Sequence, residues 1–151
     1  MGTKRSVLTD SRGVPVSVVL SGANTHDVKL VVPTLEAIVV DRPDPHEVPQ
    51  NLCADAAYVG PKAEREMRDH GYTPQVRPRN KEKDEKKQSG GAKKARRWVV
   101  EVAHSWHNRF RKLLVRYEKK ARNYHALVML ANAIIAFRMI HQPDQPNIIY
   151  G

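Results

Sequence analysis

Short β-branched runs alternate with segments of helical period along this 151-residue chain, and that order restricts the fold to the α/β class. Residues 4–9 and 14–20 are two such runs, and the turn residues from Asp10 to Gly13 that separate them predict a β-hairpin. A helix, a strand, a second helix and a second strand are expected next, before a helical C-terminal end. The whole order predicts one mixed sheet with flanking helices.

A short apolar run from Asn51 to Ala54 ends abruptly at Asp55. We interpret the run as a buried strand with an acid at its carboxyl end, where open α/β sheets hold ligands and catalytic groups. Cys53 on this run is then expected to be a small core residue. The other elements expected before the last third are a helix from the cap residues 24–27 to Val39, a helix at 61–70, a weak strand at 72–78 and a polar loop at 80–91.

The last third of the chain is helical by period. Between Ala95 and Leu114, apolar residues recur every three or four positions, which predicts one amphipathic helix with a buried stripe. A second apolar helix is expected from Ala121 to Ile140 and ends before Pro143. The residues assigned to the two buried stripes are Trp98, Val102, Trp106, Phe110 and Leu113 in the first, and Leu127, Leu130, Ala131, Ile134 and Ile135 in the second.

The excess positive charge, a net +10, is confined to two blocks. Residues 77–97 carry ten Lys and Arg against three acids, and residues 109–122 carry seven against one. Phosphate contacts come chiefly from clustered Lys and Arg, so two blocks beside one aromatic-rich helix favour binding to a nucleic-acid backbone. The alternative for either block is a solvated helical face that aids solubility.

Asp55 and Glu101, 46 positions apart, are candidate metal ligands. Glu101 lies outside the apolar stripe of its helix, one turn after Arg97 and one turn before His104. Phosphoryl transfer by two metal ions needs acidic side chains that separate elements bring together. The ordinary alternatives are a surface pair between Glu101 and Arg97 and a turn role for Asp55.

Other residues that could hold ligands keep ordinary interpretations. His26, His104 and His107 lack the paired spacing of zinc ligands and are expected to be helix-surface or capping groups. The single cysteine excludes an intramolecular disulfide framework. Trp98 and Trp106 could stack on bases, but their helical recurrence favours core packing. No stretch approaches the roughly 18 consecutive apolar residues of a membrane span, so no membrane partner is expected.

The residues around both acids resemble those of a known family. Asp55-Ala-Ala-Tyr58 resembles the D-x-x-Y/F motif of insertion-sequence DDE transposases, whose catalytic domain has a ribonuclease-H-like fold. Residues 96–113 (RRWVVEVAHSWHNRFRKL) resemble the R-W-x-V-E…W…R-x-R-x-L block around the family's catalytic glutamate. Residues 2–27 match the hairpin and helix start between the family's first two catalytic acids, and the similarity extends to about Arg138.

This resemblance implies a DNA nuclease and strand transferase that uses Mg²⁺ or Mn²⁺ and acts on double-stranded transposon ends and target DNA. Asp55 and Glu101 would be its catalytic acids and metal ligands, with Tyr58 beside them. Such a protein is expected in the cytoplasm, associated with the nucleoid. The residues that the resemblance places at the DNA are Lys94, Arg96, Arg97, Arg109, Arg111 and Lys112.

Three departures from the family pattern bear on activity. Lys94 stands where related transposases often carry tyrosine, and Asn108 stands where a basic residue is expected, with Arg109 one step on. The family's first aspartate lies on a strand that precedes this chain's first strand, and Asp10 matches the hairpin-turn aspartate instead. We therefore expect residues 1–140 to be a partial catalytic domain that is inactive alone, followed by a tail at 141–151.

Two other classes of function remain open. One is a non-catalytic DNA- or RNA-binding remnant, which would explain the charge blocks. The other is a regulator that pairs with full-length transposase through its apolar final helix. The partners to consider are therefore an upstream-encoded transposase segment and a second copy of the chain. An upstream reading frame that encodes an aspartate-bearing strand would favour the enzyme.

Overall fold

The strands of this protein form two separate sheets. The computed structural model describes residues 2–76 and 98–141. In it, β1 (Thr3–Thr9) pairs antiparallel with β2 (Pro15–Gly22), and β3 (Asn51–Ala54) pairs parallel with β4 (Thr73–Val76). The predicted α/β class is confirmed, but the described strands do not join into the single mixed sheet that we expected. Within the described part of the chain, β1 and β3 each have one edge without a partner strand.

The β1–β2 hairpin forms as the sequence predicts, and its turn chemistry shows why. Asp10 Oδ1 accepts hydrogen bonds from the backbone N–H groups of Arg12 at 2.8 Å and Val14 at 2.9 Å. Gly13 has φ 93°, a left-handed conformation that side chains disfavour. Asp10 is therefore a turn residue at the hairpin tip, as we expected.

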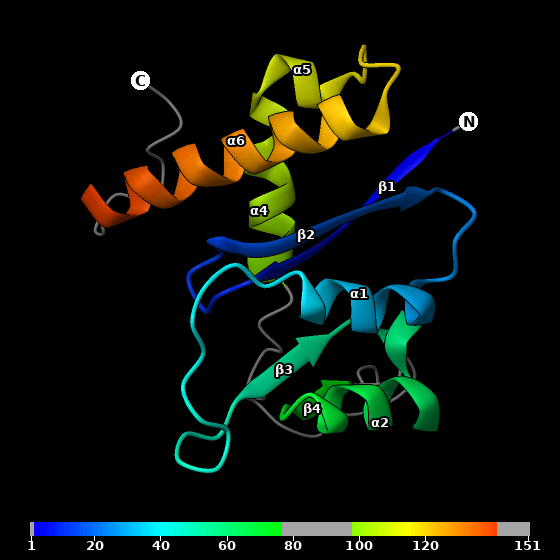
Figure 1. The fold of residues 1–151 in the computed structure, drawn as a ribbon, viewed down its shortest axis with the longest axis vertical. Coiled ribbons are helices and arrows are strands. Elements are labelled where there is room, and N and C mark those ends of the chain that lie inside the picture. The colour runs from blue at the N-terminus through cyan, green and yellow to red at the C-terminus, as the bar shows by residue number, and fades with distance from the viewer. Residues whose placement is uncertain (1, 77–97, 142–151) are drawn as a thin grey trace, which may run out of the picture.

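The hairpin separates two helical layers (Figure 1). On one face, the Oγ atom of Ser6 lies 2.8 Å from Oγ1 of Thr34 in α1 (Val31–Glu36), which follows the short helix η1 (Asp27–Leu30). On the other face, Val18 packs against Tyr124 and Val128. Because strand side chains alternate between faces, the one hairpin supplies both layers.

Helix α1 is shorter than expected. It ends at Glu36, and the backbone N–H of Val39 donates to Val16 O in β2 at 3.2 Å. Val39 is exposed. The expected extension through Val39 was wrong, because a tertiary hydrogen bond to the hairpin draws these residues out of the helix.

Beneath α1 lies a layer made of β3, β4 and α2 (Pro61–Asp69) (Figure 1). Proline at the start of α2 and Gly71 after it, with φ 79°, bound the helix as predicted. Its core joins Leu35 of α1 to Leu52 and Met67. In β3 only Leu52 is buried, so the strand that we expected to be buried is covered on one face alone, and the expectation of a core Cys53 was wrong. In a two-stranded sheet with one covered face, alternate residues point away from the core.

The expected helix through Leu114 is broken in two. Helix α4 (Trp98–Arg109) is followed by α5 (Arg111–Leu114), and Phe110 between them is extended, with ψ 107°. Trp106 of α4 is buried against Ile135 and Met139, which confirms its predicted core role. The predicted polar loop at 80–91 lies outside the described residues.

Helix α6 (Ala121–His141) crosses the far face of the hairpin (Figure 1). It contacts β2, α4 and α5, and its buried apolar residues recur every three or four positions, at Tyr124, Val128, Ala131, Ile135 and Met139. Leu130, which we had assigned to the buried stripe, is 58% exposed. The helix is apolar nearly all round, so its period did not identify the packed face.

By length and composition alone, α6 could also cross a membrane, with a mean hydropathy of 1.3. Its packing against β2 and its buried Asn132, which hydrogen-bonds to His107, hold one side of the helix against the rest of the fold, while 33% of the 18-residue window that has this hydropathy is buried in all. A core helix passes the same test of length and hydropathy, so α6 does not indicate a membrane protein.

Candidate active site

A cavity of about 370 Å³ lies between the two sheets. Its side walls are residues 5–8 of β1 and residues 52–54 of β3 with Asp55. Residues of η1 and α1 line it, as do Val100, Glu101 and His104 of α4. The fold therefore brings Asp55 and Glu101 to one cavity from separate elements, while Asp10 is not among its lining residues.

Asp55 lies at the point where β3 ends. Its Oδ1 accepts a hydrogen bond from the N–H of Ala56 at 2.5 Å, and the residue is the N-cap of η2 (Ala56–Tyr58). This capping explains the abrupt strand end in the sequence, because an aspartate side chain competes for nearby backbone groups. Asp55 is exposed, so its carboxylate remains in reach of solvent and ligands.

Tyr58, at the end of η2, also lines the cavity. Burial raises the pKa of its phenol above the ordinary value, and a hydrogen bond with Ser6 opposes that shift. The hydroxyl is therefore protonated at neutral pH and can donate a hydrogen bond into the cavity.

Glu101 and His104 enter the cavity from consecutive turns of α4. Glu101, in the first turn of the described helix, is exposed at the cavity wall. Burial lowers the pKa of His104, and the Arg5 guanidinium lowers it further, so the imidazole is neutral at pH 7. We had expected His104 on the helix surface. Its place one turn after Glu101 was the sequence signal that could have put it in the site.

Arg5 is a cavity residue that the sequence did not single out. Its Nη2 donates to Asn108 Oδ1 of α4 at 2.9 Å. Its Nη1 is buried and has no hydrogen-bond partner among the described residues. A cation in this wall favours anionic or acceptor groups nearby. Nothing in the sequence marked Arg5, because it is one of 26 Lys and Arg residues.

His107 is a core residue, contrary to our expectation of a surface or capping role. It is fully buried, and its Nε2 lies 2.6 Å from Asn132 Oδ1 of α6. Burial lowers the pKa of His107, and the charge of Arg5 and the neighbouring His104 lower it further. The hydrogen bond to Asn132 raises it and so opposes the shift. His26 precedes η1 as its N-cap but makes no side-chain cap bond. Neither residue lines the cavity.

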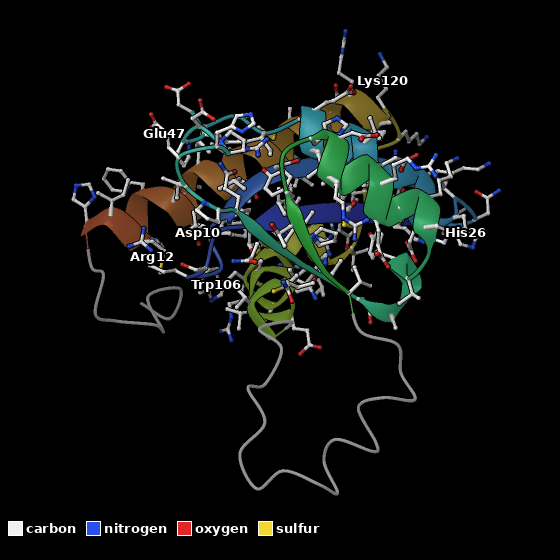
Figure 2. All side chains as sticks on the ribbon, turned by 90° about the horizontal axis from the view of Figure 1, so that it is seen from below. Asp10, Arg12, His26, Glu47, Trp106 and Lys120 are labelled. Atoms are coloured by element: carbon white, nitrogen blue, oxygen red, sulfur yellow. The ribbon has the colours of Figure 1, made fainter. Side chains whose placement is uncertain are left out.

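Half of the expected DNA-contacting set can be placed. Arg109 ends α4, while Arg111 and Lys112 begin α5, and all three are exposed. Figure 2 shows Lys120 far from Arg12 at the hairpin tip, so positive groups also lie at widely separated points. Lys94, Arg96 and Arg97, with the whole first basic block, lie outside the described residues.

Two carboxylates of the cavity lining could hold a divalent cation. Carboxylate oxygens are the ligands that Mg²⁺ and Mn²⁺ prefer, and Asp55 and Glu101 provide them. Across residues 2–76 and 98–141, no group of three or more His, Cys, Asp and Glu side chains is arranged to hold a metal ion. Asp55 and Glu101 could therefore supply at most two of the side-chain ligands of such an ion within the described residues.

Comparison with known proteins gives two matches. Residues 1–136 match the family described as transposase DDE domain. The chain is also 32% identical, over 147 residues, to a transposase for insertion sequence element IS402 from Burkholderia cepacia. That match covers 95% of this chain and 67% of the relative. No solved structure gives a significant match.

Proposed function

This chain belongs to the DDE transposase family, and we propose that its cavity is the metal-binding centre of an enzyme that cuts and joins DNA. Family membership assigns the chain to DNA transposition in an insertion element. The observation that carries the finer proposal is that Asp55 and Glu101, from separate elements, line the same cavity. The sequence motifs around Asp55 and Glu101 and the family match are statements about sequence, whereas the shared cavity is a property of the fold of this chain.

Asp55 and Glu101 would hold divalent cations of the kind that this family uses, with Mg²⁺ as the proposed ion and Mn²⁺ as its substitute. Such ions activate an attacking oxygen and stabilise the leaving oxygen of a phosphodiester. The chain's own groups prepare the surroundings. Arg5 adds a positive charge to the cavity lining, and the neutral His104 and protonated Tyr58 offer hydrogen bonds without adding charge.

We further propose that a third acid completes the centre and that the two sheets are parts of one ribonuclease-H-like sheet. Two carboxylates hold a pair of divalent cations poorly. The partnerless edges of β1 and β3 face the same cavity, which supports an additional strand between them. The chain by itself should then neither cut nor join DNA.

Double-stranded DNA would approach along α4 and α5. Arg109, Arg111 and Lys112 are exposed there, next to the helix that carries Glu101. Contacts of this kind neutralise phosphates and position the duplex without reading its sequence.

Titration with Mn²⁺, followed by electron paramagnetic resonance, tests the metal centre without requiring turnover. We expect weak binding by the purified chain, weakened at least tenfold by Asp55→Asn and by Glu101→Gln. Asp10→Asn is the matched control, since Asp10 does not line the cavity, and it should bind as the wild type does. Equal binding by all four proteins would remove the proposed centre.

A regulatory role is the second candidate, and one observation favours it. Leu130, Phe137 and Ile140 of α6 are each more than half exposed, at 58%, 61% and 71%. A chain that pairs with full-length transposase through this helix would not need metal. In that case, inhibition of transposition by the co-expressed chain would survive Asp55→Asn and be lost on Phe137→Ser.

A further inference from the structure

The β1–β2 hairpin contacts α1 partly through buried hydroxyl groups. Ser6 of β1 and Ser17 of β2 are both buried, and both bond to Thr34 of α1. The Ser6 Oγ atom lies 2.8 Å from Thr34 Oγ1, while Ser17 Oγ donates to the Thr34 carbonyl oxygen. On the side of α6, by contrast, the buried Val18 and the partly buried Val7 belong to an apolar core. Hydrogen bonds therefore help to set how the hairpin lies on α1.

Serine is an unusual residue for a strand position that a helix covers. A buried hydroxyl group is costly unless it makes a hydrogen bond, and an apolar side chain would fill the same place without that cost. A hydrogen bond also has a preferred direction, which an apolar contact lacks. The bond to Thr34 thus restrains the rotation of the Ser6 side chain, and a restrained hydroxyl group can hold a third residue in a defined place.

Tyr58 of η2 is that third residue. Its phenol hydroxyl bonds with Ser6, and its half-buried ring packs against the core that contains Leu35 and Leu52. A hydroxyl group can donate one hydrogen bond while it accepts another, so Ser6 can bond to Thr34 and Tyr58 together. Ser6, Thr34 and Tyr58 all line the cavity, and they connect β1 and α1 to the turn that follows β3.

The position of Tyr58 determines the position of Asp55, because both belong to one short turn. The Tyr58 N–H donates to the Asp55 carbonyl oxygen at 2.9 Å, and Asp55 Oδ1 accepts from the N–H of Ala56 at 2.5 Å. Within the described residues, β3 does not pair with the hairpin, so strand hydrogen bonds do not hold Asp55 relative to β1. The bond between Ser6 and Tyr58 is a polar link that does.

We propose that Ser6 is a positioning residue of the candidate metal centre. Held by Thr34, its hydroxyl group fixes Tyr58, and Tyr58 fixes the turn that presents Asp55 to the cavity. Because α4 contacts β1, the same link sets Asp55 relative to Glu101. This role rests on the proposed function, since it takes the two acids to be metal ligands. The link from Ser6 to the turn needs neither metal nor DNA and can be measured without them.

Hydrogen exchange of the η2 amides in the full chain tests the link directly. The N–H groups of Ala56, Tyr58 and Val59 donate the hydrogen bonds of the turn. Ser6→Ala and Tyr58→Phe should each speed the exchange of these amides by about fivefold. The double variant should be no faster than either, because both changes remove the same bond. Tyr58→Phe keeps the ring and its packing, and Ser6→Thr, which keeps a hydroxyl group, should retain the wild-type rate.

Ser17→Ala is the matched control. Ser17 is buried like Ser6 and also bonds to Thr34, but it does not line the cavity. Its loss should lower the free energy of unfolding of the chain and leave the exchange of the η2 amides unchanged.

The Tyr58 phenol gives a second measurement, which separates loss of the bond from loosened packing. The Ser6 hydrogen bond lowers the pKa of Tyr58 against the larger effect of burial. Ser6→Ala should therefore raise this pKa further, whereas a phenol that became exposed would show a lower pKa. Ser6→Thr and Ser17→Ala should leave it at the wild-type value. The charged groups that also act on this phenol are the same in all these variants, and they are Asp27, Lys4 and Asp55.

A pH titration of the chain, isotope-labelled at tyrosine Cζ and followed by NMR, measures the pKa of Tyr58. The spectrum of Tyr58→Phe identifies its signal among those of the five tyrosines.

Titration with Mn²⁺ then connects the link to the metal centre. Ser6→Ala and Tyr58→Phe should each weaken binding about threefold, less than the roughly tenfold or more that loss of a group bonded to a metal ligand costs. Ser6→Thr should bind as the wild type does. Absence of Mn²⁺ binding by the wild type would remove the proposed function, and the exchange rates and the Tyr58 pKa would still decide whether Ser6 holds the turn.

Four outcomes would overturn the role of Ser6. Unchanged exchange in Ser6→Ala would mean that Asp55 is held by its own cap alone. Increases that add in the double variant would mean that Ser6 and Tyr58 act separately. An equal increase in Ser17→Ala would assign the effect to the packing of α1 on the hairpin. A lower Tyr58 pKa in Ser6→Ala would indicate loosened packing in place of a lost bond.

Discussion

The core around α6 and the cavity between the two sheets differ in how completely they are packed. In the core, Val18, Val128 and Ile135 are buried, and Nε2 of the buried His107 has Asn132 as its partner, although its Nδ1 has none among the described residues. Around the cavity, β1 and β3 each leave a strand edge unpaired, Asp55 and Glu101 are exposed, and one Arg5 guanidinium nitrogen is without a partner, all within the part of the chain that the structure describes. The difference indicates that the first region maintains the fold and the second is left available for ligands.

The largest expected effect belongs to the α6 core. Ile135→Ala should lower the free energy of unfolding by about 2–5 kcal/mol, because Ile135 is 1% exposed and packs with Trp106 and Met139. Leu130→Ala, on the same helix but 58% exposed, should change it by less than about 1 kcal/mol. Urea denaturation followed by circular dichroism measures both. Equal losses would mean that α6 packs by a different face.

His107 should make stability depend on pH. Burial lowers its pKa in the folded chain below the ordinary 6.5, so between those two values the unfolded chain binds more protons. Stability is then fully present above pH 6.5 and falls as the pH drops toward the folded pKa. His107→Asn should reduce the difference in urea midpoint between pH 7.5 and pH 5.5, while the exposed His26→Asn should leave it unchanged.

Removal of the imidazole should also destabilise the chain at pH 7.5, by about 1–3 kcal/mol, because Asn132 loses its buried partner. A pH difference that His107→Asn does not alter would place the responsible titration elsewhere.

Asp10 and Asp55 allow a turn-forming acid to be compared with a proposed metal ligand. Asp10→Ala should lower stability by about 1 kcal/mol, since its carboxylate accepts two backbone hydrogen bonds at the turn, and it should not alter Mn²⁺ binding. Asp55→Asn should show the reverse pattern, because its amide oxygen can still cap η2. Chemical denaturation and metal titration on the same two proteins make the comparison. The opposite assignment would be supported if Asp10→Ala lost the metal.

The smallest effect on the fold is expected at the basic surface. The double variant Arg111→Ala with Lys112→Ala should keep the free energy of unfolding within about 0.5 kcal/mol of the wild-type value. The plot of log affinity for duplex DNA against log salt should become less steep by about two phosphate contacts, or roughly 1.8 units of slope. The exposed pair Lys29→Ala and Lys62→Ala should do much less. Fluorescence anisotropy of labelled duplex DNA at several salt concentrations measures both slopes. Equal losses of affinity in the two double variants would mean that the basic block is only a solvated surface.

Local chemistry made much of the fold predictable. The hairpin followed from Asp10 and Gly13, and α2 from Pro61 and Gly71, because each of these residues acts through its own backbone geometry. The features that we missed depend on distant partners. Val39 leaves α1 to bond to Val16, and the packed side of α6 was not marked by its uniformly apolar sequence.

The candidate site was predictable only in part. Asp55 could be placed at a strand end from the sequence pattern, but spacing alone did not require Asp55 and Glu101 to line the same cavity. Arg5 and His107 were missed for the same physical reason. A residue type does not reveal burial, and each contact forms only in the folded chain, where α4 packs on β1 at Arg5 and on α6 at His107.

The unpaired edges of β1 and β3 also bear on how the chain behaves at high concentration. An edge that can accept one strand offers the same backbone groups to any extended segment, including a strand of a neighbouring copy. The net charge of +10 repels such copies at low salt, and salt screens that repulsion. Solubility should therefore fall as ionic strength rises, so that storage in concentrated salt, the usual remedy for basic proteins, would promote aggregation of this one.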